Sequence, residues 1–442
     1  MPPPLLITDV MIMERRPFSS ASNLPALIAI AGYNLVEMKY EKKAHDSVHA
    51  ALASDDILCE ILLRLPEKSV FKLILVSKKW LHLICSNSFR SSYHSRWREN
   101  VHLLGFFVCN FLYLGRPRDG FRRPPWEPAL PLLSTCKEGD DLKFSGILKQ
   151  LGYFIDSSNG LLLCGRHPMT YYVWNPITKQ PYQLPQPQQF YRSLCMAFII
   201  EDSHDDAICY KVIRAKCVCK PVDVNTVSIE TFSSKTSTWK QSTLTCSSSF
   251  ALCPRTVATV IKGVVHWFAA QRNLAIYDLY LGLRRISLIK LPAGELSYDY
   301  EESVLGESSD GLLQYGQSSM LGIEIWVLEK KQSSNSSIYK STHSGERWIL
   351  RHKLNFRAMW KQNPTFTEHS KESQILSFLP RNSESVFIRS GSNIFLYDFE
   401  SKRLEVVHYQ GRGSSISWDS SKIVPYFRPT WPCSSYVNDL TV

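Results

Sequence analysis

The residues of this chain that could do chemistry form two short groups of potential metal ligands. One is His-Asp-Asp at 204–206, and the other is the C-x-C pair at 217–219. The first group lies between two apolar runs, 198–200 and 208–210, so a solvated hairpin turn explains it better than a metal site. The cysteine pair has no second pair at metal-ligand spacing, and residues two apart on a strand share one face. The sequence therefore predicts no metal site.

Other catalytic arrangements are also missing from the sequence. It contains no Gly-rich phosphate loop, no H-E-x-x-H and no G-x-S-x-G motif. His266 stands beside Trp267 within a strand pattern, so core or cross-strand packing is its favoured role. We therefore expect a chain that is not an enzyme, with no catalytic residue and no cofactor.

Composition favours a globular protein of more than one unit. The chain has 442 residues, of which 44% are hydrophobic and 12% aromatic. Its net charge of +11 is spread along the chain, so nucleic-acid binding is not expected. The twelve cysteines are scattered, as in reduced cytoplasmic or nuclear proteins. The apolar run at 24–31 is too short to cross a bilayer, so no membrane association is expected.

The elements with the clearest pattern are three short helices between residues 51 and 97. Ser54 could cap the first helix and Ser69 the second, while Pro66 ends the first. Three helices in about 45 residues are close to the lower size limit of a stable fold. Such a unit is expected to complete its core against a partner. The apolar residues that would form its ridge recur at helical spacing: Ile57, Leu58, Ile61, Leu62, Leu65, Val76 and Trp80.

This segment resembles the F-box motif. The similarity lies in the aliphatic first helix at 55–62, the Arg-Leu-Pro at 64–66 and the Val-x-Lys-x-Trp at 76–80. Two places depart from the motif: Ala-Ser at 53–54 replaces a Leu-Pro, and 72–75 lacks the usual basic element. Neither departure removes the apolar ridge. The resemblance implies docking on a Skp-type adaptor and, through it, on cullin and RING subunits of a ubiquitin ligase.

Within this resemblance, the apolar ridge is the predicted contact with the adaptor. Trp80 and Leu65 are the expected anchors, because a few well-buried groups, Trp foremost, dominate such contacts. Some ridge residues must instead hold the three helices together, and the sequence does not divide these two roles. The predicted adaptor-binding residues are Ile57, Leu58, Ile61, Leu62, Leu65, Pro66, Val76 and Trp80.

From about residue 100 the sequence changes to short apolar runs separated by Gly, Ser, Asn and Pro, which is typical of many short strands. Spacing of about 45 to 70 residues suits four-stranded blades, so a β-propeller is predicted, with a β-sandwich pair as the alternative. The length predicts six to eight blades of about 45–50 residues. Five runs share one plan, an apolar strand, a polar turn and a second strand: 171–180, 229–239, 274–279, 323–328 and 394–399.

This half resembles the F-box-associated, kelch-like domain of plant F-box proteins. The similarity rests on Ser-Asn-Gly-Leu-Leu at 158–162, Trp-Asn-Pro-Ile-Thr-Lys at 174–179 and the Phe-to-Trp segment at 232–239. The predicted class is an α+β multidomain protein, a three-helix F-box followed by a mainly antiparallel propeller. The expected division is a loosely ordered leader at 1–50, the F-box at 51–97, the propeller at 98–430 and a tail at 431–442.

The function that this resemblance implies is substrate recognition in an SCF-type (cullin–RING) E3 ubiquitin ligase. The chain would hold a target protein of unknown identity near enzymes supplied by other subunits, and so act by proximity. Loops on a rigid scaffold are the expected target contacts, namely 186–192, 293–303 and 332–345. The alternative is a propeller that binds a carbohydrate or small ligand beside a vestigial F-box.

Overall fold

The structure, a computed structural model, divides at Arg96 and Trp97 into two compact units, which are described separately. The predicted leader and tail lie outside the described residues. The described residues are most of 54–96, then 103–109 and 133–134, then most of 151–427, with the longest gaps at 294–302, 331–345 and 409–421.

Among the described residues of the first unit are the helices α3 (Asp55–Leu62), α4 (Glu67–Ile74) and α5 (Lys78–Cys85). Ser54 occupies the N-cap position of α3, but its side chain makes no capping hydrogen bond. The predicted cap at Ser69 is wrong, because α4 begins two residues earlier. The side-chain cap lies instead on α5, where Ser77 Oγ accepts a hydrogen bond of 3.2 Å from the Trp80 amide.

The helices enclose a small apolar core. Leu58, Leu62, Val70 and Ile84 are completely buried, and Trp80 is nearly so. Tyr93 lies beyond α5 in the chain, and its hydroxyl donates a buried hydrogen bond of 2.8 Å to the Leu65 carbonyl oxygen. Within the described residues, no helix combines the length and apolar character that a membrane span requires.

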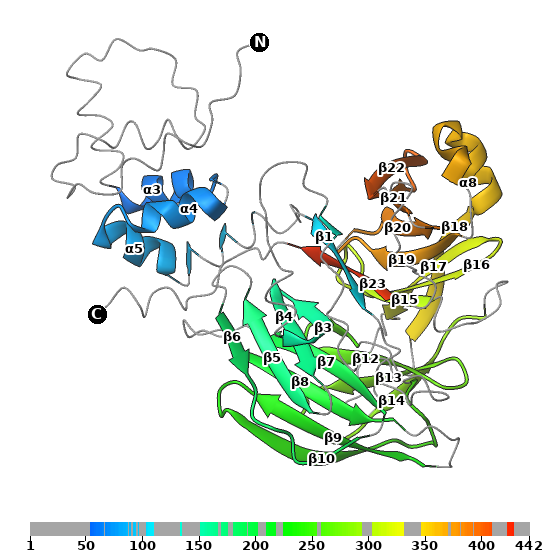
Figure 1. The fold of residues 1–442 in the computed structure, drawn as a ribbon, viewed down its shortest axis with the longest axis horizontal. Coiled ribbons are helices and arrows are strands. Elements are labelled where there is room, and N and C mark those ends of the chain that lie inside the picture. The colour runs from blue at the N-terminus through cyan, green and yellow to red at the C-terminus, as the bar shows by residue number, and fades with distance from the viewer. Residues whose placement is uncertain are drawn as a thin grey trace, which may run out of the picture. The chain divides into compact units, whose positions relative to one another are not determined.

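The second unit is built from antiparallel sheets (Figure 1). In each four-stranded sheet the strands pair in chain order. We number these sheets as blades in chain order. The first blade contains β3 (Tyr153–Ser158), β4 (Leu161–Arg166), β5 (Thr170–Asn175) and β6 (Gln180–Gln183), and the second contains β7 (Leu194–Glu201), β8 (Cys209–Lys216), β9 (Thr226–Ser233) and β10 (Thr238–Thr245). The third contains β11 (Thr259–Ile261), β12 (Val264–Ala269), β13 (Asn273–Asp278) and β14 (Ser287–Lys290), the fourth contains β15 (Ser303–Glu307), β16 (Leu313–Ser319), β17 (Gly322–Lys330) and β18 (Glu346–Asn355), and the fifth contains β19 (Ser373–Phe378), β20 (Ser385–Ser390), β21 (Asn393–Asp398) and β22 (Arg403–His408).

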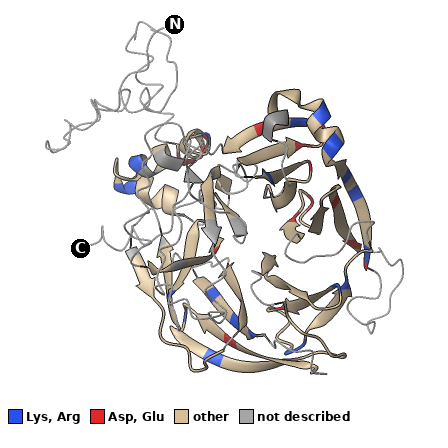
Figure 2. Cartoon of the chain, turned by 45° about the vertical axis from the view of Figure 1, so that its right-hand side comes forward, with Lys and Arg blue, Asp and Glu red and all other residues tan. Residues whose placement is uncertain are grey.

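A three-stranded sheet joins the two ends of this unit. It contains β1 (Leu103–Cys109), which lies between β2 (Leu133–Ser134) and β23 (Lys422–Phe427). The first strands of successive blades contact one another, while β1 contacts β3 and β23 contacts β19. The sheets therefore close into a ring, and Figure 2 shows them set around a common centre. The fold is a β-propeller, as predicted, and not a sandwich.

The predicted count of six to eight blades is wrong, since the described residues form five four-stranded blades. The five runs of similar sequence fall on the third strand of each blade, namely β5, β9, β13, β17 and β21. Division of the length overestimated the count because much of the chain lies between strands. The helix α8 (Phe356–Gln362) and the 3-10 helix η4 (Pro364–His369) separate β18 from β19, for example, and residues 331–345 separate β17 from β18.

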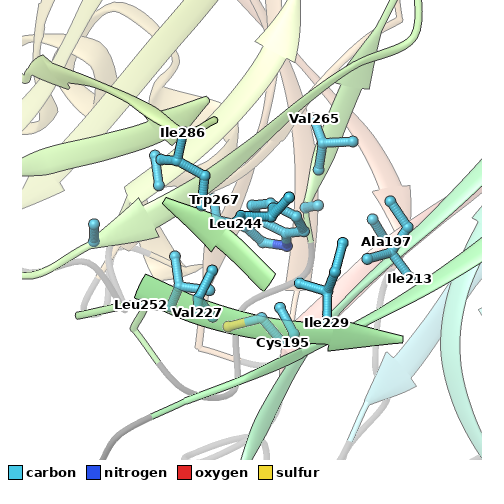
Figure 3. Packing of buried hydrophobic residues seen from close by; sticks show 14 of the residues in the cluster. Cys195, Ala197, Ile213, Val227, Ile229, Leu244, Leu252, Val265, Trp267 and Ile286 are labelled. Atoms are coloured by element: carbon cyan, nitrogen blue, oxygen red, sulfur yellow. The ribbon is translucent and has the colours of Figure 1, made fainter. Parts of the chain in front are cut away.

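Apolar side chains fill the space between neighbouring blades. One large cluster joins the blade of β7–β10 to the blade of β11–β14, with Trp267, Ile229 and Leu244 completely buried in it (Figure 3). Burial of apolar surface on this scale is the dominant favourable term in folding. His266 is buried on β12, and its Nδ1 is 3.1 Å from the Thr259 carbonyl oxygen, as expected for a packing role in the core.

Candidate interaction surfaces

The predicted adaptor-binding residues of the helical unit separate by burial into two groups. Leu58, Leu62, Leu65 and Trp80 lie in the core of the chain itself. The expected anchors Leu65 and Trp80 are only 3% and 7% exposed in the chain by itself, so they offer little area to a partner. Three of the remaining members reach the surface. Ile57 is 48% exposed, Ile61 and Val76 are partly exposed, and Pro66 lies outside the described residues.

Leu75 is an apolar surface residue that the sequence analysis did not assign to the adaptor contact. It is 74% exposed and directly follows the last residue of α4, Ile74. Because α4 ends at Ile74, Leu75 does not continue the helical spacing that places Val70 and Leu73 in the core. The departure from the F-box motif at 72–75, where an aliphatic run replaces a basic element, was the available signal for this position.

The helical unit also carries exposed charged residues. Lys79 Nζ lies 2.8 Å from Asp55 Oδ1 and ties the start of α5 to the start of α3. Both side chains are largely exposed, so the pair contributes little to stability. Burial raises the pKa of the Cys59 thiol, and the nearby Glu60 and Asp56 carboxylates raise it further. A thiol with a raised pKa is a poor nucleophile, which favours a structural role for Cys59.

On the propeller, one predicted target loop is described almost completely. Residues 186–191 connect β6 to β7, and their backbone is held by a buried glutamate. Glu230 Oε1 accepts hydrogen bonds from the amides of Gln188 (2.9 Å) and Gln189 (3.0 Å). Trp239 Nε1 donates to the Pro185 carbonyl oxygen at 2.7 Å. This loop therefore has a fixed conformation and presents an exposed Phe190.

The glutamate that holds this loop is paired with a buried arginine. Arg214 Nη1 forms an ion pair with Glu230 Oε2, and both side chains are inaccessible to solvent. Arg214 Nη1 also donates to the Gln189 carbonyl oxygen at 3.0 Å, and its Nε donates to Tyr171 Oη at 3.2 Å. The guanidinium lies 5.1 Å from the centre of the Tyr191 ring. Burial, the leading cause, raises the Tyr171 pKa despite the neighbouring arginine, so its hydroxyl stays protonated.

Other predicted positions of interest lie partly outside the described residues. These are the loops 294–302 and 332–345, the His-Asp-Asp at 204–206 and Cys219. Cys217 is buried, and its Sγ lies 3.1 Å from Cys195 Sγ. No group of three His, Cys, Asp or Glu side chains suited to hold a metal ion occurs among the residues with described positions. Charged residues of both signs are interspersed over the blades (Figure 2).

Comparison with known proteins agrees with this architecture. Residues 54–92 match the F-box domain model, and residues 143–376 match the model described as "F-box protein At3g26010-like, beta-propeller". The chain is 51% identical to the Arabidopsis thaliana F-box protein At5g03970 over 392 residues, which cover 88% of this chain and 90% of that protein. It is 24% identical to the Arabidopsis F-box protein At5g07610 over 73% of this chain and 76% of that protein.

A third relative carries the kelch name. The putative F-box/kelch-repeat protein At3g17540 of Arabidopsis is 25% identical over 62% of this chain and 68% of that protein. The two family models thus match the helical unit and the β-propeller in turn. The chain belongs to the family of F-box proteins with a C-terminal β-propeller.

Proposed function

We propose that this chain is the substrate-recognition subunit of an SCF-type E3 ubiquitin ligase. The helical unit binds a Skp-type adaptor, and the propeller binds the target protein. The observation that carries the proposal is that apolar side chains of the helical unit reach solvent: Ile57 and Leu75 are exposed, and Ile61 and Val76 are partly exposed. Large apolar side chains exposed on so small a unit favour a protein partner.

The structure supports a division of labour within the predicted ridge. Leu58, Leu62, Leu65 and Trp80 give the unit its shape, because they are buried in it. Ile57 and Leu75 are the proposed contacts with the adaptor, because they combine large apolar side chains with high exposure. The propeller supplies rigid loops, and ubiquitin transfer by other subunits is accelerated by proximity alone.

The test is co-purification of the full chain with a plant Skp-type adaptor. The double variant Ile57→Asp, Leu75→Asp places two charges in the proposed contact, and charges that must be desolvated without a partner are costly. We expect the apparent affinity for the adaptor to fall by about tenfold or more, as for central interface residues elsewhere. Titration with purified adaptor measures the change.

A matched control is Met320→Asp, which introduces the same charge at an exposed apolar residue of the propeller. This variant is expected to bind the adaptor as the wild type does. Hydrogen exchange of residues 55–85 shows whether the double variant keeps its helices. Adaptor binding at wild-type affinity by a folded double variant would refute the proposed contact.

A further inference from the structure

A loop of the third blade exposes three large apolar side chains side by side. It connects β13 to β14, and its residues Tyr280, Leu281 and Leu283 are 65%, 56% and 54% exposed. The preceding Leu279, by contrast, packs against the core between the blades. Single exposed apolar residues are ordinary, but a group of three within four positions indicates an interaction site. We name this group, Tyr280, Leu281 and Leu283, the 280s patch.

The start of the loop is fixed by an aspartate. Asp278 Oδ1 accepts hydrogen bonds from the amides of Tyr280 (2.8 Å) and Leu281 (3.2 Å). An aspartate side chain that accepts from amides two and three residues ahead forms a turn without the help of a strand partner. The backbone of the first two patch residues is therefore held in one conformation.

The aromatic ring of the patch rests on a glycine of the adjacent hairpin. A Cβ atom on Gly263 would overlap the ring of Tyr280, and Gly263 has a φ of +78°, which favours glycine. Gly263 lies in the turn between β11 and β12, at the same end of the blade as the loop. The ring of Tyr280 is thus supported by the turn at Gly263, although the residue is 65% exposed.

The end of the loop is tied to the neighbouring blade. The Thr245 amide donates to the Arg284 carbonyl oxygen at 2.9 Å, and the Ile286 amide donates to the Thr245 carbonyl oxygen at 2.8 Å. Ile286 itself is buried in the core between the blades. The loop is therefore anchored at both ends, so the exposure of its apolar residues is built into the fold. A preorganised loop loses little conformational entropy on binding.

Positive charge borders the 280s patch. Arg284 and Arg285 directly follow it and are exposed. Lys262 beside Gly263 is also exposed, and its Nζ donates a hydrogen bond of 3.4 Å to the Gly311 carbonyl oxygen of the neighbouring blade. In the part of the chain that the structure describes, no ion pair joins either arginine to an acidic residue. The carboxylate within the loop, Asp278, is occupied by backbone amides. The surroundings of the patch thus attract a negatively charged partner.

We propose that the 280s patch is a docking site for a protein segment that combines large apolar residues with Asp or Glu. The apolar side chains of that segment cover Tyr280, Leu281 and Leu283, and its carboxylates meet Arg284, Arg285 and Lys262. Two leucines favour a protein segment over a nucleic acid, because nucleic acids offer flat bases and phosphates rather than aliphatic side chains. The assignment of the 280s patch as the site that binds the ligase target rests on the function proposed above.

The test uses the full chain and a phage-displayed library of random peptides of about twelve residues. We expect enriched peptides to combine Leu, Ile or Phe with Asp or Glu. The variant Leu281→Ser, Leu283→Ser should bind the enriched peptide about tenfold or more weakly in fluorescence polarisation. The variant Arg284→Glu, Arg285→Glu should reverse the selected charge, so that peptides with Lys or Arg are enriched.

A matched control is Met320→Ser, Leu321→Ser, which removes two exposed apolar residues at another turn of the propeller. It should select the same peptides as the wild type. The proposal is overturned if the patch variants select the same peptides with the same affinity, if no acidic bias appears, or if folded wild type selects nothing. Binding of oligo-dT that is lost in the same variants would assign the patch to nucleic acid and also overturn it.

Adaptor binding separates this proposal from the proposed function. Both patch variants should bind the Skp-type adaptor as the wild type does, because the patch lies on the propeller unit. Conversely, Ile57→Asp, Leu75→Asp should keep peptide binding. Peptide binding without adaptor binding in the wild type would reject the ligase function and leave the docking site standing.

Discussion

At the scale of single residues, the buried Arg214 and Glu230 pair stands out in the propeller. Removal of two charges from water is expensive, and only good geometry and further hydrogen bonds compensate for it. Here those hydrogen bonds go to the backbone of the loop at 186–191. The pair therefore couples the core of the second blade to the conformation of an exposed loop.

We predict that Arg214→Met lowers the free energy of unfolding by roughly 3–5 kcal/mol, because it leaves Glu230 charged, buried and unpaired. The double variant Arg214→Met, Glu230→Gln should recover much of this loss, since no buried charge remains. Urea denaturation followed by tryptophan fluorescence measures both. A single variant as stable as the wild type would show that the ion pair carries little of the stability.

Residue patterns predicted some of these positions and not others. The Phe232 and Trp239 segment was recognised as a hairpin, and the two rings do lie 5.4 Å apart across β9 and β10. The Arg214 pair was not predicted, because its partners lie on different strands and a distant loop. Alternation within one strand identifies a buried face, but it does not show which charges meet there.

At the scale of elements, the helical unit shows how far periodicity can go. The spacing predicted three helices and their apolar residues, and all three helices are present. The helical spacing did not separate core residues from surface residues, because burial depends on how α3, α4 and α5 pack against one another. Ile57 and Leu58 are adjacent and both aliphatic, yet one is half exposed and the other fully buried.

We predict that Trp80→Ala destabilises the helical unit by roughly 3–5 kcal/mol, the usual cost of deleting a buried Trp. Because so small a unit has a low free energy of unfolding, residues 55–85 of the Trp80→Ala variant should exchange their amide hydrogens rapidly. Exchange mass spectrometry of the full chain measures this. The matched surface variant Leu75→Asp should keep slow exchange, and equal protection in Trp80→Ala would contradict the core assignment.

The strands of the blades were also partly predictable from the sequence. Each of the five similar runs was predicted as a strand that leads through a polar turn into a second strand, and in the structure each falls on the third strand of a blade. The count of runs was thus a better guide than the length. The 280s patch was not predicted, because the exposure of its residues depends on Gly263 and Thr245, which lie elsewhere in the sequence.

At the scale of the whole propeller, closure of the ring depends on strands from its two ends. Residues of β1 pair with β23, for example Phe107 with Val424. No local sequence pattern predicts such a pairing, because the two strands lie at opposite ends of the propeller sequence. Aromatic contacts then join the closing sheet to its neighbours: Phe106 meets Phe387 at 5.4 Å, and Phe107 meets Phe154 at 4.5 Å.

We predict that truncation after residue 421, which removes β23, opens the ring. The loss takes away the strand partner of β1, the buried Tyr426 ring, and its hydrogen bond of 3.1 Å to the Gly160 carbonyl oxygen. Truncation after residue 430 keeps β23 and is the matched control. Limited proteolysis should cut the first variant rapidly within the first and fifth blades, because these flank the closing sheet. Equal resistance of both variants would mean that five four-stranded blades hold together without the closing strand.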